Sequence, residues 1–117
     1  MNKEIKIGEN TYPMIANLGT AILYRDLTKR DWTQDLVSVK EKKVPVALSL
    51  TIIQEMAYCM NVQATSSTLE EMEAKLNKND YFLWISQFDL ASFGKDCMTE
   101  IMGLWNSQDK SVIEGKN

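Results

Sequence analysis

The sequence contains no histidine, only two cysteines and no long uninterrupted hydrophobic run. Histidine is the side chain most often used for proton transfer near neutral pH and is a common metal ligand, so its absence removes both roles. Cys59 and Cys97 do not form a CxxC pair, and each lies within a predicted apolar helix face, where a thiol behaves as a small hydrophobe. We therefore expect no thiol or zinc chemistry and a reducing compartment.

Glycine-rich and membrane-type segments are also missing. The five glycines stand singly, and neither GxxxxGK[ST] nor GxGxxG occurs, so no phosphate-binding loop is expected. The longest weakly charged stretch, Val44 to Val62, contains Gln54 and Glu55, and a carboxylate inside a bilayer is costly. The N-terminal "MNKEIKIGEN" has alternating charges in place of a basic cap and an apolar run. We expect a cytoplasmic protein without a signal peptide or membrane span.

The charge balance is mildly acidic, with a net charge of −3 and a sequence pI of about 4.9. This charge gives no general attraction to nucleic acid or to anionic membranes, and it is too low for a DNA-mimicking inhibitor. A chain of 117 residues with 44% hydrophobic and 25% charged residues is typical of one folded domain. Nucleic acid is not an expected partner.

Alternating apolar residues predict an N-terminal β-hairpin, in which "KEIKI" and "TYPMI" are joined by a turn at Gly8 to Asn10. Pro13 lacks an N–H, so its strand should be an edge strand or bulged. Because a lone hairpin is marginally stable, it should lie on helices. The predicted fold class is α+β, mainly α: a hairpin packed on a small bundle of four to five helices. We expect one domain over residues 1–105 and a flexible tail over residues 106–117.

The first predicted helix follows Asn17, a plausible N-cap, and carries apolar residues on two sides. Leu18 and Ile22 fall on its charged side. We expect them to lie beneath the hairpin; the alternative is that they contact another copy of the chain, and together with the edge strand they predict self-association. Sedimentation over a wide range of concentration tests the alternative.

Residues 31–43 read as a connector, and Pro45 suits an early position of the next helix. The apolar residues from Val46 to Met60 cover more than half of a helix circumference and predict the central helix of the fold. Its polar strip is expected to comprise Thr51, Gln54, Glu55 and Tyr58.

Three further helices are predicted from cap signals. Ser67 and Glu70 have capping-box spacing for a helix through about Leu76. Asp80 is expected to cap the aromatic helix "YFLWISQF", and Asp89 to cap a last helix from Leu90 to Trp105. The predicted core stripe of that last helix is Leu90, Phe93, Cys97, Ile101 and Leu104.

No catalytic, metal-binding or cofactor-binding residue is predicted. An enzyme would require Glu55, Tyr58 and the acidic helix to converge on one pocket. That helix contains Glu70, Glu71 and Glu73, but adjacent glutamates point to different faces, and acids are favoured in a first helical turn anyway. We do not expect an enzyme.

The candidate partner-binding surface lies on the last two helices, where methionine and aromatic residues gather. Unbranched methionine side chains adapt to varied apolar partners. The predicted partner-binding residues are Trp84, Phe88, Met98, Met102 and Trp105. The alternative is that the methionine and tryptophan flank of the last helix is part of the core.

The order of these features resembles the tail assembly chaperones of long-tailed phages and prophages of Gram-positive bacteria. The segments that carry the resemblance are "TYPMIANLGTAILYRDLTKRDW", "LTIIQEMAYCMN" and "FLWISQFDLASFGKDCMTEIMGLW". The resemblance implies a small cytoplasmic protein that associates with the tape measure protein and assists assembly of the tail tube. The alternative is a helical adaptor or regulator that binds a single host or phage protein. The neighbouring genes, a tube protein upstream and a long helical tape measure downstream, would separate the two.

The resemblance also implies a longer, frameshifted product that recruits the tail tube protein. Residues Glu114 to Lys116 can be encoded GAG GGA AAA, which contains the slippery heptamer GGGAAAA, although Gly-Lys is equally an ordinary polar tail. We expect the gene to contain this heptamer and an overlapping reading frame. Codons that break the G and A runs would end this proposal without affecting the chaperone interpretation.

Overall fold

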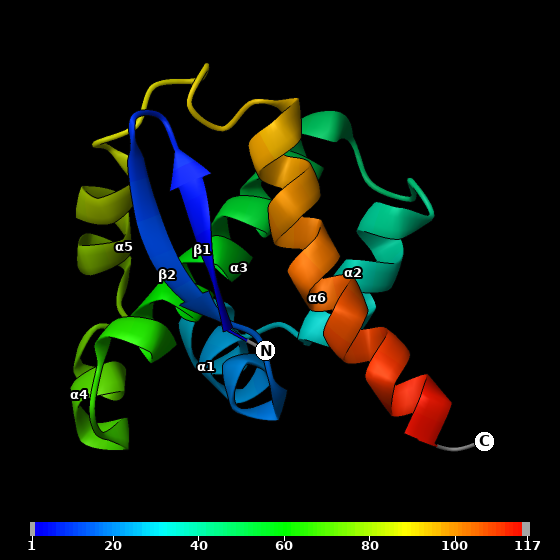
Figure 1. Cartoon of the computed structure of the whole chain (residues 1–117), viewed down its shortest axis with the longest axis horizontal. Coiled ribbons are helices and arrows are strands. Elements are labelled where there is room, and N and C mark those ends of the chain that lie inside the picture. The colour runs from blue at the N-terminus through cyan, green and yellow to red at the C-terminus, as the bar shows by residue number, and fades with distance from the viewer. Residues whose placement is uncertain (1, 116–117) are drawn as a thin grey trace.

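The hairpin packs against a group of helices, as predicted. The computed structural model describes the backbone of residues 2–115 and the side chains of residues 3–105. Within the described residues the elements are β1 (Asn2–Ile7), β2 (Asn10–Ile15), α1 (Leu18–Thr28), α2 (Trp32–Lys40), α3 (Val46–Thr65), α4 (Leu69–Ala74), α5 (Lys78–Ile85) and α6 (Lys95–Gly115). Figure 1 shows α5 and α6 on either side of the hairpin. The predicted fold class is confirmed, with six helices in place of four to five.

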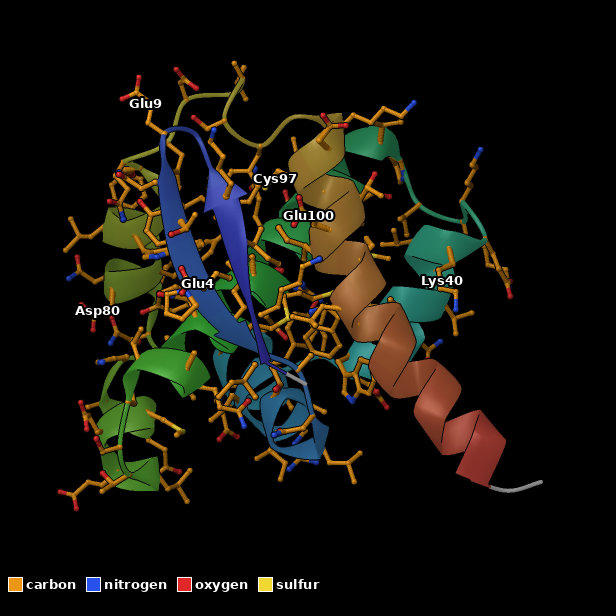
Figure 2. All side chains as sticks on the ribbon, in the orientation of Figure 1. Glu4, Glu9, Lys40, Asp80, Cys97 and Glu100 are labelled. Atoms are coloured by element: carbon orange, nitrogen blue, oxygen red, sulfur yellow. The ribbon has the colours of Figure 1, made fainter. Side chains whose placement is uncertain are left out.

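The hairpin buries one face and exposes the other. Ile5 pairs with Tyr12 in an antiparallel register, and Ile5, Ile7 and Met14 are buried against the helices. On the opposite face, the Thr11 hydroxyl donates to Glu4 Oε1 at 2.9 Å; Glu4 is labelled in Figure 2. Gly8 opens the two-residue loop with a φ of 69°, which suits a type II′ turn. The hairpin is thus a cover over the helical core.

The hairpin is anchored to α3 through Pro13. The side-chain amide of Asn61 donates to the Pro13 carbonyl oxygen at 3.0 Å. Proline has no N–H to donate within the sheet, but its carbonyl oxygen can still accept a hydrogen bond. Position 13 therefore contributes a contact between layers.

Helix α1 begins where it was predicted to, but its exposed side differs from the prediction. Asn17 and Thr20 form a capping box. The Thr20 hydroxyl donates to the Ile15 carbonyl oxygen at 3.1 Å, so a polar residue occupies the position beside β2. Leu18 is 65% and Ile22 49% exposed. The expectation that these two residues lie beneath the hairpin is wrong.

The predicted connector over 31–43 is largely helical. Asp31 caps α2 by accepting from the Thr33 N–H at 2.8 Å. Trp32 and Leu36 are buried, and their i,i+4 spacing puts both on one face of the helix. These two apolar residues anchor the charged segment on the core.

Helix α3 is the central helix and extends five residues past Met60, to Thr65. Polar residues in the added turn are satisfied by other elements, since Gln63 donates to Asn17 Oδ1 at 2.8 Å. Tyr58 is buried rather than part of an exposed polar strip, because its hydroxyl donates to the Lys75 carbonyl oxygen at 2.7 Å. Leu48, one of the apolar residues of the predicted central helix, is exposed near the N-terminal end of α3.

The caps of α4 and α5 differ from the predicted ones. Thr68 caps α4 by accepting from the Glu71 N–H at 3.1 Å, while Ser67 N–H donates to the Glu71 carboxylate. The cap is therefore one residue later than predicted, and the glutamate side chain accepts from the residue before the cap, so the reciprocal capping box does not form. Asn77 rather than Asp80 caps α5.

The last helix begins later and ends later than predicted. Asp89 accepts from the Ser92 N–H at 2.9 Å inside the loop before α6, so it caps a turn. Four of the five predicted core-stripe residues are buried, and Leu90 is exposed. Helix α6 continues past Trp105 to Gly115, so residues 106–115 have a helical backbone. Residues 116 and 117 of the predicted tail lie outside the described residues.

Candidate protein-binding surface

Helix α5 is held on the domain by an aromatic cluster. The ring centroids of Trp84 and Phe88 lie 5.0 Å apart, and Phe88 is 5.4 Å from both Tyr12 and Phe93. Trp84 also lies 5.4 Å from Tyr58 of α3. Most of these pairs are edge-to-face, the arrangement that the ring quadrupoles favour. The cluster fixes the inner side of α5 against β2 and α3.

The outer side of α5 is apolar and open. Helix α5 has no fully buried residue; Phe82 and Leu83 are each 61% exposed, and Leu90 in the following loop is 85% exposed. Ile85 and Phe88 line a hollow of about 330 Å³ at the C-terminal end of the helix. Phe82 and Ile85 are helical neighbours at i,i+3, so the exposed ring lies on the same side of α5 as one lining residue of the hollow. We call Phe82, Leu83, Ile85, Phe88 and Leu90 the α5 surface.

Two carboxylates lie at the ends of the α5 surface. Asp80 stands in the first turn of α5 and Asp89 lines the hollow. Figure 2 shows Asp80 at the outer edge of the helix. A partner with an apolar stripe bordered by lysine or arginine would match this distribution of charge.

The five predicted partner-binding residues do not form one surface. Trp84 on α5 and Phe88 just after it lie together and are half-buried. Met98 and Met102 are half-buried on α6, which lies across the hairpin from α5 (Figure 1). Trp105 is fully buried, with its ring centroid 4.5 Å from that of Trp32. Its place among the contact residues is therefore corrected: Trp105 belongs to the core.

The sequence contained a signal for the residues that were missed. Tyr81 to Ile85 are five consecutive apolar residues, which at 100° per residue point around the whole helix. A helix lying on a domain buries one side only, so part of such a run has to be exposed. Phe82 and Leu83 could have been found from this pattern.

The groups considered for catalysis have separate structural contacts. Arg30 donates to Asp35 Oδ2 at 2.8 Å and also to Glu55, and the Tyr24 hydroxyl donates to Asp35 at 2.6 Å. Burial raises the pKa of Glu55. Tyr58 instead contacts the Lys75 carbonyl, and burial raises its pKa to about 12. This network joins α1, α2 and α3 and does not gather Glu55, Tyr58 and the glutamates of α4 around one hollow.

The two thiols are placed as the sequence predicts. Cys59 and Cys97 are free and buried. Burial raises the pKa of Cys59, and it raises the pKa of Cys97 to about 11. Both side chains are therefore protonated at neutral pH.

Among the described residues, no group of three or more acidic or cysteine side chains is placed to hold a metal ion. Over the same part of the chain, no helix is both long enough and apolar enough to cross a membrane. Comparisons with protein-family models, with curated proteins and with solved structures gave no match.

Proposed function

We propose that this protein is a tail assembly chaperone that binds helical segments of a phage tape measure protein at the α5 surface. The class of partner is taken from the resemblance of the sequence segments given above. The observation that carries the binding site is the exposure of Phe82 and Leu83 on α5 together with Leu90, which lines the hollow at the end of that helix. Contiguous exposed apolar residues are typical of protein interaction sites.

The chemistry of such a partner fits the α5 surface. A tape measure protein is expected to be long and helical, with apolar stripes that associate with each other until tube subunits enclose them. An amphipathic helix buries such a stripe by inserting apolar side chains into a groove. The hollow beside Phe88 offers the pocket, and Asp80 and Asp89 favour basic residues beside the stripe. No metal or nucleotide takes part in this mode of binding.

Replacement of Phe82 and Leu83 together by Gln is expected to weaken binding of tape measure fragments at least about tenfold, because two apolar side chains lose their burial in the complex. The fold should be retained because both side chains are exposed. Calorimetric titration of overlapping helical fragments measures the affinity, and circular dichroism checks the fold. Val46→Gln, an exposed apolar position on α3, is the matched control.

Unchanged affinity in the Phe82→Gln, Leu83→Gln variant would contradict the proposed site. A folded Met98→Gln, Met102→Gln variant that loses binding would move the site to α6. Binding of fragments in many registers supports a chaperone. A single one-to-one complex with one other protein would instead support the adaptor function.

A further inference from the structure

A second exposed apolar surface lies on α1 and α2, on other elements than the α5 surface. Leu18 and Ile22 are i,i+4 neighbours on one face of α1 and are both exposed. Ile22 also borders a hollow of about 260 Å³ whose other lining residues are Ala21, Arg25, Asp31, Trp32 and Thr33. The apolar pair thus stands at the edge of a concave site.

The concave site continues along α2. A second hollow of about 300 Å³ shares Asp31 and Thr33 with the first and is also lined by Val37, which is exposed. The two hollows therefore adjoin each other across the start of α2. We call Leu18, Ile22, Val37 and the two hollows the α1 surface.

The charges of the α1 surface have both signs. Arg25 from α1 and Asp31 from the α2 cap line the same hollow. Lys43 lines the second hollow and is paired with Glu41. A partner with charges of one sign would meet repulsion as well as attraction there. A second copy of the same surface carries a matching cation and anion, as a twofold-symmetric contact between identical patches requires.

We propose that a second copy of this chain binds the α1 surface, with the two α1 helices antiparallel and Ile22 near the twofold axis. Antiparallel packing about position 22 sets position 18 of one helix opposite position 26 of the other. Four residues of helix span about 6 Å. Leu18 of each copy then lies beside the part of the other copy's hollow that Arg25 lines. The same contact between an exposed leucine and a hollow therefore forms twice in the dimer.

This pairing leaves the α5 surface of each copy uncovered, because α1 and α5 lie at different sides of the molecule (Figure 1). The inference does not depend on the proposed function. It can be tested on the protein alone, without a tape measure fragment.

The wild-type protein is expected to sediment as a concentration-dependent dimer, and Leu18→Asp combined with Ile22→Asp should weaken dimerisation at least tenfold. The reason is that symmetry brings the two introduced carboxylates at position 22 close together. Both side chains are exposed, so circular dichroism should report an unchanged fold. A wild-type protein that stays monomeric at all concentrations, or a folded variant that still dimerises, would overturn the proposal.

A second measurement tests directly whether Ile22 lies near the twofold axis of the dimer. Under mild oxidation, Ile22→Cys should form a disulfide-linked dimer, whereas Val46→Cys, also exposed, should not. The natural cysteines are buried and do not compete. Equal cross-linking of both variants would overturn the proposed geometry.

Discussion

Replacement of Ile52 by Asp is expected to unfold the domain. Ile52 is 2% exposed on the central helix α3, where a carboxylate would have neither water nor a cation. An unpaired buried charge of this kind costs about 3–5 kcal/mol, which is a large part of the stability of a small domain. Denaturant titration followed by circular dichroism measures the loss.

The neighbouring substitution Thr51→Asp is the control for Ile52→Asp. Thr51 is on the same helix but exposed, so the same charge remains in water. Its effect should stay within about 0.5 kcal/mol. An Ile52→Asp protein that melts within about a degree of the wild type would show that α3 is misplaced in the core.

Replacement of Arg30 by Met is expected to destabilise the protein by about 2 kcal/mol at neutral pH, less than for a fully buried ion pair because the Arg30 side chain is 40% exposed. The variant leaves the Asp35 and Glu55 side chains, 14% and 16% exposed, without their common cation. Denaturant titration at several pH values measures the change.

The destabilisation should depend on pH in a defined direction. Without Arg30, burial of Glu55 is no longer opposed by the cation, so its folded-state pKa lies above its unfolded value and folding favours its protonated form. The variant should recover stability as the pH falls through the carboxylate range and lose it as the pH rises. Burial already raises the pKa of Glu55 in the wild type.

Adding Glu55→Gln to Arg30→Met should restore part of the stability, because one of the two unpaired charges is removed. This double variant separates the loss of charge pairing from the loss of the arginine's packing. A destabilisation that is independent of pH and is not relieved by Glu55→Gln would contradict the assigned role of the network.

Local signals predicted the hairpin, the Asn17 cap and the central helix correctly, because each rests on neighbouring residues. Segments decided by contacts between distant elements were harder to predict. Residues 32–40 form a helix on the domain in which Trp32 and Leu36 are buried in the core. The charged "KEKK" run at its end made the segment resemble an exposed connector. The caps at Thr68 and Asn77 compete with equally suitable residues nearby, and hydrogen bonds in the folded domain select between them.

The candidate site was predicted only in part for the same reason. Trp84 and Phe88 were identified from composition, but the orientation of α5 depends on Tyr12 of β2 and Tyr58 of α3. Trp105 shares an apolar helix flank with Met98 and Met102, yet its ring packs on Trp32 and Tyr24. Periodicity gives the side of a helix, whereas burial depends on what the rest of the chain places there.

Amide hydrogen exchange of the whole protein, with and without a tape measure fragment, tests the central claim most directly. The account predicts that bound fragment slows exchange from Tyr81 to Leu90 and leaves α1 and α2 unchanged. Protection confined to α1 and α2, or to α6, or bound fragment with no protection at α5, would contradict binding at the α5 surface.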